Sequence, residues 1–94
     1  MIPASPVSDA QIAALTAKGD WNQVGDLLEG TFVFASYGAA LDFVVAVAAI
    51  AEDQNHHPEI TLGFDRVSVR VSTHETHSIT ARDLYFVDAV SELR

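Results

Sequence analysis

Residues 51–59 read Ala-Glu-Asp-Gln-Asn-His-His-Pro-Glu, and residues 71–80 read Val-Ser-Thr-His-Glu-Thr-His-Ser-Ile-Thr. All four histidines of the chain lie in these two segments. Pro58 cannot continue a helix and biases the residue before it towards an extended conformation, so a helix must give way to a strand beside His56 and His57. A hairpin between the two segments would return the chain to this junction at His74 and His77. We therefore expect a site of converging imidazoles.

The residues after this junction give the clearest strand signal in the sequence. We expect strands at 60–64 and 67–73, with a turn around Asp65 and Arg66. The second strand alternates between a core side and a solvent side: Val67, Val69 and Val71 face one way, and Ser68, Arg70 and Ser72 face the other. Thr80 then begins a C-terminal helix, because Asp83 stands where a capping box needs a carboxylate. Its expected buried stripe is Phe86, Val87, Val90 and Leu93.

The longest helix is expected over residues 37–55, with Ser36 as its N-cap and apolar residues on nearly every face. A single sheet covers only one side of a helix, so the second apolar face suggests packing against another helix or another subunit. A first helix is expected at 9–18, capped by Ser8. A hairpin that pairs 21–24 with 31–34, across a turn framed by Gly25-Asp26 and Glu29-Gly30, completes the order αββαββα. The sequence thus predicts a single α+β domain over residues 9–94, after a flexible N-terminal tail at 1–8. Its helices should pack on one face of a four-stranded antiparallel sheet.

Composition excludes several classes of function. The chain has 94 residues and a formal net charge of −8, with 5 lysines and arginines against 13 acidic residues. No basic stripe exists to neutralise a phosphate backbone, so direct binding to nucleic acid or to an anionic membrane is not expected. The longest uninterrupted apolar run, residues 43–51, is far shorter than the ~20 residues of a membrane-spanning helix, and no signal peptide is recognisable. The absence of cysteine excludes disulfides and thiolate sites and fits a soluble, cytoplasmic protein.

The histidines allow more than one interpretation by themselves. Glu52 and His56 are four residues apart on one helical face, so the carboxylate could orient the imidazole, or the two could form a simple interaction at the helix end. His57 must point away from His56, since adjacent residues do not share a face. Three or four imidazoles can also build a zinc site, although neighbouring histidines chelate poorly and no cysteine completes the set. We favour an acid-base site over a metal site.

Four motifs in this order resemble the pterin-4a-carbinolamine dehydratase family: Ala51-Glu52-x-x-x-His56-His57-Pro58-Glu59, Phe64-Asp65-Arg66-Val67, Ser72-Thr73-His74 and Thr80-x-x-Asp83. The upstream residues are similar to the first hairpin and long helix of that family: Trp21, Phe32, Phe34, Tyr37, Ala40 and Phe43. The resemblance covers residues 9–93. The chain departs from it where Phe64 replaces a usual tyrosine, and where Glu-Thr-His-Ser at 75–78 replaces a glycine-containing loop. His77 lies outside the family pattern, and we interpret it as an exposed loop residue rather than a fourth catalytic group.

The resemblance implies an enzyme that removes water from 4a-hydroxytetrahydrobiopterin (pterin-4a-carbinolamine) and gives quinonoid dihydropterin, which is recycled for aromatic amino acid hydroxylases. It implies no metal and no organic cofactor. One imidazole must protonate the leaving hydroxyl while another accepts a ring-nitrogen proton, and this chemistry suits histidine near neutral pH. By the family pattern, His56, His57 and His74 carry this chemistry. His56 and His74 are expected to be the acid-base groups, and His57 chiefly positions the substrate and can share the proton work. The same pattern implies the supporting and substrate-binding positions: Glu52 to orient His56, Asp83 to support the floor of the pocket, and Asn55, Pro58, Ser72, Thr73 and Glu75 to bind the pterin.

The family also implies a second kind of role, in which the same fold is a dimerisation partner of a transcription factor through its helical face. A non-catalytic protein-binding module is therefore the alternative to the enzyme. The three imidazoles favour catalysis, because a pure scaffold has no physical need for them around one cleft. Self-association is a further explanation of the apolar long helix: sheet edges could pair in a homodimer, and long helices could pack in a homotetramer.

Overall fold

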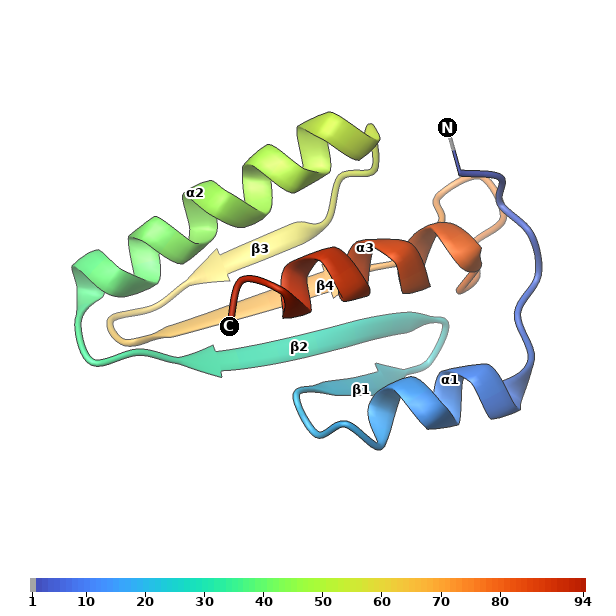
Figure 1. The fold of residues 1–94 in the computed structure, drawn as a ribbon, viewed down its shortest axis with the longest axis horizontal. Helices are drawn as coiled ribbons and strands as arrows, with labels where there is room; N and C mark the ends of the chain where they lie inside the picture. The colour runs from blue at the N-terminus through green and yellow to red at the C-terminus, as the bar shows by residue number, and fades with distance from the viewer. Residues whose placement is uncertain (1) are drawn as a thin grey trace.

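The computed structural model describes residues 2–94, which form three helices and one four-stranded antiparallel sheet. The expected order αββαββα is confirmed (Figure 1). The strands lie in the order β1-β2-β4-β3, so β2 and β4 form the centre of the sheet and β1 and β3 its edges. The elements in chain order are α1 (Asp9–Thr16), β1 (Trp21–Val24), β2 (Leu27–Val33), α2 (Tyr37–Gln54), β3 (Glu59–Leu62), β4 (Arg66–Val71) and α3 (Ala81–Ser91).

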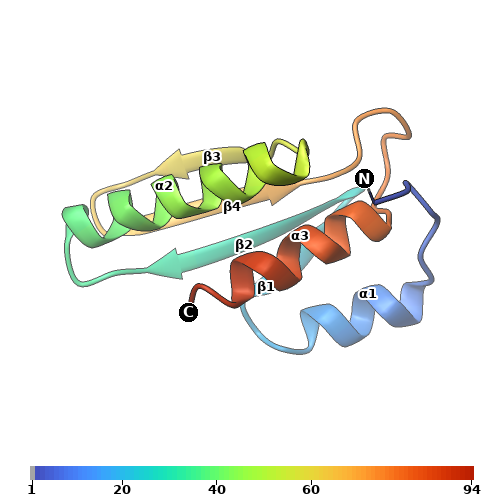
Figure 2. The same cartoon turned by 45° about the horizontal axis from the view of Figure 1, so that its top comes forward.

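The three helices pack on one face of the sheet, as expected (Figure 1, Figure 2). The alternation expected in β4 is present, because its valines are buried and its arginines exposed. One core cluster joins the strands to every helix: Ile12 and Leu15 from α1, Phe43 and Val47 from α2, Phe86 and Val90 from α3, and Leu28, Phe32, Val67, Val69 and Val71 from the sheet. Burying each large apolar side chain stabilises the fold by about 1.5–3 kcal/mol. The opposite face of the sheet carries the polar residues of the strands.

The first hairpin is tighter than expected. Strand β2 begins at Leu27 rather than at residue 31, and Val24 pairs directly with Leu27. Gly25 has a φ of +59°, a left-handed conformation that glycine adopts without strain, so the chain reverses at once. Gly30, which reads as a turn residue, therefore lies inside the strand. A side chain is excluded there, because a Cβ at Gly30 would lie 2.9 Å from the Trp21 ring.

The helix caps are as expected: Ser8, Ser36 and Thr80 are the N-caps. Thr80 and Asp83 form the predicted capping box. The expectation that Leu93 is buried is wrong, because α3 ends at Ser91 and Leu93 lies beyond the buried stripe with 41% of its surface exposed. Strand β3 ends at Leu62 rather than at residue 64, and strand β4 ends at Val71 rather than at residue 73.

Residues 2–8 run beside the start of α3 (Figure 1). The backbone N–H of Ala81 donates to the carbonyl of Ser5 at 2.9 Å, and Pro6 forms an isolated β-bridge with Thr80. Val7 packs against the core. Residue 1 lies outside the described residues, and the flexibility of the segment 1–8 stays a prediction.

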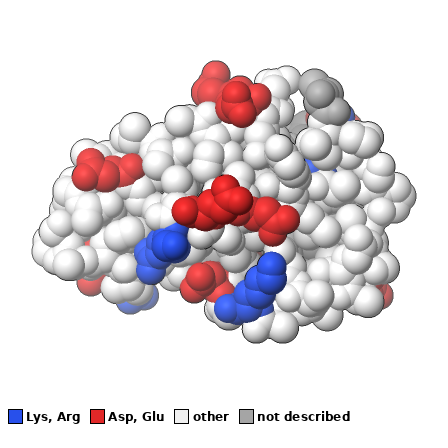
Figure 3. Space-filling view, in the orientation of Figure 1, with Lys and Arg blue, Asp and Glu red and all other residues white. Residues whose placement is uncertain are grey.

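Acidic residues outnumber basic ones in the chain, 13 to 5. On the face seen in Figure 3, Asp and Glu side chains are spread over the molecule, while the Lys and Arg side chains form no continuous patch. This face offers no basic surface for a phosphate backbone. Within residues 2–94, no helix has the length and apolar character needed to cross a membrane.

Candidate active site

The site is built where α2 ends and the chain turns into β3. Asn55 caps α2 in a left-handed conformation, with φ 50° and ψ 45°, and His56 is the first residue beyond it. This turn directs the His56 side chain towards the start of α3, where its Nε2 lies 2.6 Å from Oδ1 of Asp83. The expectation that Glu52 orients His56 is therefore wrong. The four-residue spacing brings side chains together only inside a helix, and this helix ends at Gln54.

Asp83 is the buried centre of a polar network. Its side chain is fully buried, and that of His56 is only 10% exposed. Its second oxygen, Oδ2, accepts hydrogen bonds from the Thr80 N–H at 2.8 Å and from Thr73 Oγ1 at 2.9 Å. Thr73 is itself fully buried and also bonded to Thr80 through the side-chain hydroxyls. Thr73 thus supports Asp83 from the core side, and the expectation that its side chain lines the pterin pocket is wrong.

The pair with Asp83 orients the His56 ring. Where the Asp83 carboxylate is ionised it only accepts hydrogen bonds, and Nε2 of His56 is then the donor in this pair. The other ring nitrogen, Nδ1, is then the one left to exchange a proton with a ligand. An imidazole oriented by a buried carboxylate is the arrangement that general acid-base catalysis uses.

His57 points the other way, as expected for adjacent residues. Its Nε2 lies 2.8 Å from Oε1 of Glu52, and the two side chains are 56% and 79% exposed. Exposed pairs of this kind are worth only ~0–1 kcal/mol, so Glu52 holds His57 much less firmly than Asp83 holds His56. The two neighbouring histidines therefore differ in burial, in partner and in rigidity.

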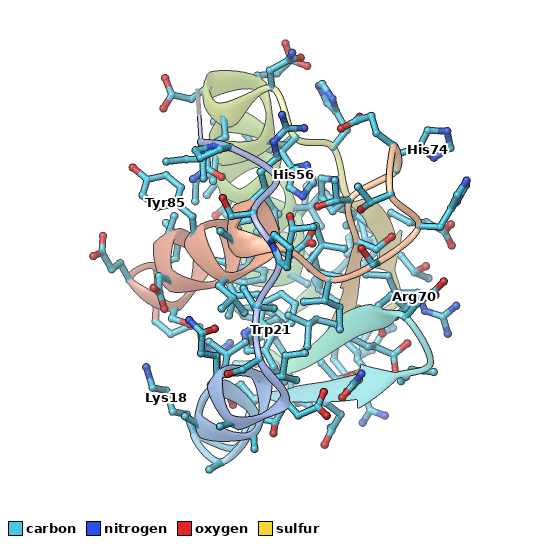
Figure 4. The ribbon with its side chains drawn as sticks, turned by 90° about the vertical axis from the view of Figure 1, so that its right-hand side faces the viewer. Lys18, Trp21, His56, Arg70, His74 and Tyr85 are labelled. Atoms are coloured by element: carbon cyan, nitrogen blue, oxygen red, sulfur yellow. The ribbon has the colours of Figure 1, made fainter. Side chains whose placement is uncertain are left out.

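A cavity of about 270 Å³ opens beside His57, between the ends of three strands. His57 and His74 both line it, so the expected return of the chain to the junction is confirmed for this pair. Figure 4 looks at this end of the molecule, with His56 near its middle, His74 on the outer loop and Arg70 on the sheet. The lining residues are Leu27, His57, Glu59, Arg70, Val71, Ser72 and His74.

His74 stands on a short loop that closes on itself. An isolated β-bridge between Thr73 and Ser78 forms the base of the loop. His77 has a φ of +50°, and its ring meets the ring of His74 edge to face, with centroids 5.6 Å apart. Both histidines are exposed, so His77 lies on the surface as expected. It borders His74 rather than the cavity.

A second, much smaller hollow of about 10 Å³ adjoins His56 and is lined by Ile2, Gln54, Asn55, His56 and Arg82. Arg82 donates from Nε to the carbonyl of Ile2 at 2.8 Å and from Nη1 to Oε2 of Glu75 at 2.6 Å. Glu75 thus ties the His74 loop to α3, and it lies outside both hollows. Its expected contact with the substrate stays a prediction.

The structure gathers part of the predicted site. His57, His74 and Ser72 share the cavity, while His56 and Asn55 line the separate, smaller hollow. Pro58 lines neither of them. Sequence reasoning missed the other cavity residues: Leu27, Glu59, Arg70 and Val71. For Arg70 a signal existed, because it lies on the outward side of the strand that directly precedes Ser72 and His74. Among residues 2–94, no group of three or more histidine, aspartate or glutamate side chains is arranged to hold a metal ion.

Comparison with known proteins gives a consistent result across sequence and structure. A family model described as pterin 4 alpha carbinolamine dehydratase matches residues 5–93. The chain is 40% identical over 88 residues to a Thermomicrobium roseum protein provisionally named pterin-4-alpha-carbinolamine dehydratase. That alignment covers 93% of this chain and 95% of the relative.

Two solved structures share the fold. A crystal structure of a transcriptional coactivator/pterin dehydratase from Brucella melitensis superposes with a TM-score of 0.83, covering 93% of this chain and 96% of that one. At 22% identity this likeness speaks for the fold alone. The other is a pterin dehydratase-like protein identified as a RuBisCO assembly factor in the alpha-carboxysome. It is 26% identical, with a TM-score of 0.67 over 79% of this chain and 88% of that one.

Proposed function

Because the chain belongs to the pterin 4 alpha carbinolamine dehydratase family, we propose that it removes water from 4a-hydroxytetrahydrobiopterin and releases quinonoid dihydropterin. The observations that carry the proposal are the buried pair of His56 and Asp83, and a cavity lined by His57, the next residue in the chain, together with His74. The proposed enzyme is a hydro-lyase of tetrahydropterin recycling. Its chemistry is proton transfer, which the side chains of the site supply by themselves.

The reaction requires two proton movements on one small ring system. One proton goes to the 4a-hydroxyl oxygen, and another leaves the ring nitrogen bonded to C4a. The C4a–O bond then breaks, water departs, and a carbon–nitrogen double bond forms in its place. Atoms and charge balance without an electron acceptor, so an acid and a base on opposite sides of the reacting carbon are sufficient.

We assign these two roles to His56 and His74. His56 is held by a buried carboxylate and keeps Nδ1 for exchange with the substrate, which suits a group that must act in one fixed orientation. His74 stands on the loop that lines the cavity together with His57, and its imidazole can transfer the other proton. His57, exposed and held by Glu52, is assigned to positioning the ring. Asn55 beside His56 and Ser72 in the cavity are the proposed polar contacts of the pterin, and Pro58 keeps the backbone at His57 extended.

The test is stopped-flow absorbance of freshly generated 4a-hydroxytetrahydrobiopterin. The wild type should accelerate its decay over buffer, and His56→Ala and His74→Ala should each lower turnover by about 10²-fold or more, the scale of a general acid-base group. His77→Asn is the matched control, because it removes an exposed imidazole outside the cavity and asparagine tolerates the left-handed backbone there. It should stay within a few-fold of the wild type.

The variants and the wild type answer separate questions. Wild-type protein that leaves the decay at the buffer rate would overturn the dehydratase. Acceleration that survives His74→Ala would keep the activity but remove His74 from the mechanism. Circular dichroism of each variant identifies a rate lost through unfolding.

The second candidate is a non-catalytic protein-binding module. The outward face of α2 favours it, because Tyr37, Leu41 and Val45 are 50%, 43% and 62% exposed on one helix. A relative of the same fold is described as a RuBisCO assembly factor, so protein binding is a role that such a fold can take. Lack of any wild-type acceleration, with a folded protein, would move the assignment to this candidate.

We further propose that the protein is a cytoplasmic homodimer or homotetramer. The exposed apolar face of α2 supports self-association, since exposed apolar patches on a protein surface mark contact surfaces. The aromatic amino acid hydroxylases are the proposed pathway partner, because they produce the carbinolamine that this enzyme would consume.

A further inference from the structure

The wall of the cavity opposite the loop is made by charged side chains on the open face of the sheet. Arg70 of β4 stands between Glu29 of β2 and Glu59 of β3, which are its direct Cα partners on the two neighbouring strands. Arg70 and Glu59 line the cavity together with His57 and His74. A flat ring that reaches both imidazoles therefore directs its substituents towards this pair or away from the protein.

The Arg70 guanidinium is held in place but still has donors to offer. Its Nε lies 2.6 Å from Oε2 of Glu29, and its side chain is 50% exposed. Among residues 2–94, Glu29 is the one hydrogen-bonding partner of the Arg70 side chain, and the Glu59 carboxylate has none. The terminal nitrogens of Arg70 are donors and the oxygens of Glu59 are acceptors, so the cavity presents both kinds of group side by side.

A pair of this kind matches vicinal hydroxyl groups. Each hydroxyl donates one hydrogen bond and accepts others, so a diol can accept from a guanidinium and donate to a carboxylate at once. Charge argues against an anionic substituent. Glu29 and Glu59 flank a single arginine, and the chain carries a net charge of −8, so a phosphate or carboxylate on the ligand would meet repulsion.

We propose that Arg70 and Glu59 bind a neutral, hydroxylated side chain of the pterin and so set the substrate preference of this protein. Leu27 and Val71 form the apolar wall against the ring, while the charged pair takes the hydroxyl groups. At about 270 Å³ the cavity is smaller than the ~300–1,000 Å³ of drug-sized sites, which fits a bicyclic ring with a short side chain. This inference rests on the proposed dehydratase function and adds its substrate class.

The experiment compares two substrates that differ only in this side chain. Stopped-flow rates are measured for the 4a-hydroxy forms of tetrahydrobiopterin, which has a dihydroxypropyl group, and of 6-methyltetrahydropterin, which has a methyl group. Arg70→Met should lower kcat/KM for the dihydroxypropyl substrate by about 10-fold or more, mainly through KM, as expected for losing hydrogen bonds to a charged group. Glu59→Gln should act in the same direction. The methyl substrate should change less than about 2-fold in either variant, because it makes none of these bonds.

Arg66→Met is the matched control. Arg66 lies on the same strand and is exposed, but it does not line the cavity. It should leave both substrates at the wild-type rate. Equilibrium binding of the stable pterins biopterin and 6-methylpterin gives a second readout, in which Arg70→Met should weaken biopterin alone.

The outcomes separate the two proposals. If the wild type accelerates the decay of neither substrate, the dehydratase function is overturned. The proposed substrate preference is then overturned as well, because it rests on that function. If it accelerates both and Arg70→Met lowers both equally or neither, the inference is overturned and the function stands. A loss confined to the dihydroxypropyl substrate, in both turnover and binding, supports it.

Discussion

Two carboxylates each hold one histidine of this site, and burial makes their contributions different. Asp83 is fully buried and also accepts from Thr80 and Thr73, so removal of its charge disturbs a network without access to water. Glu52 is 79% exposed, and water can replace it at His57. Hydrogen bonds to buried charges are worth more than exposed ion pairs, so the two positions form a natural comparison.

Asp83→Asn should lower both stability and turnover, while Glu52→Gln should change neither by much. The buried amide keeps the shape of the carboxylate but loses the charge that holds His56, so we expect a stability loss of about 1–3 kcal/mol and a fall in kcat of about 10-fold or more. For Glu52→Gln we expect a loss of ~0–1 kcal/mol, the usual range for an exposed pair. Urea unfolding and stopped-flow dehydration measure the two effects. Equal effects of the two variants would contradict the distinction between a buried and an exposed partner.

The histidines themselves could be predicted from the sequence, but their partners could not. Pro58 shows that a helix must end near His56, and the strand alternation returns the chain at His74. The pairing of His56 with Asp83 depends on the left-handed turn at Asn55, which redirects the side chain from α2 towards α3. A helical spacing rule cannot anticipate that turn, because any residue past the cap has left the helical face.

At the scale of elements, local sequence signals were sufficient to predict a helix or strand where each residue had a single structural role. Alternating valines predicted β4, and the caps at Ser36 and Thr80 predicted where α2 and α3 begin. The first hairpin was misread because Gly30 looked like a turn residue. Its lack of a side chain serves packing against Trp21 instead, and that contact exists only after the strands pair.

Gly30→Ala and Gly38→Ala should change stability in opposite directions. A Cβ at Gly30 would lie 2.9 Å from atoms of both Trp21 and Phe32, so overpacking should cost about 1–3 kcal/mol. Gly38 lies in the first turn of α2, where the nearest atom to a new Cβ is 4.0 Å away. Alanine fits there without strain and should stabilise by about 0.4–1 kcal/mol through the unfolded chain. Chemical unfolding of both variants tests the pair, and tolerance of Gly30→Ala would contradict the tight Trp21 contact.

At the scale of the whole molecule, sheet order decides which residues surround the cavity. Leu27 begins β2, Glu59 begins β3 and Arg70 is the last residue but one of β4, and the order β1-β2-β4-β3 brings these three positions to one end of the sheet. The sequence predicted the two hairpins, β1 with β2 and β3 with β4, but not that β2 and β4 are neighbours at the centre of the sheet. The imidazole side of the site was therefore predictable, while the wall that carries Arg70 was not.

The outward face of α2 leads to a prediction about assembly. Leu41 and Val45 lie one helical turn apart in the N-terminal half of α2, whereas the histidines lie beyond its C-terminal end. We expect the wild type to be a dimer or tetramer in multi-angle light scattering, and the double variant Leu41→Glu with Val45→Glu to have a smaller mass, because two added carboxylates would repel their copies across a helix contact. Ala10→Glu, an exposed substitution on α1, should leave the mass unchanged. The double variant should keep its circular dichroism, because both side chains are largely outside the core. A wild-type monomer would contradict self-association altogether, and an unchanged mass of the folded double variant would show that copies associate through another surface, such as the edge strands β1 and β3.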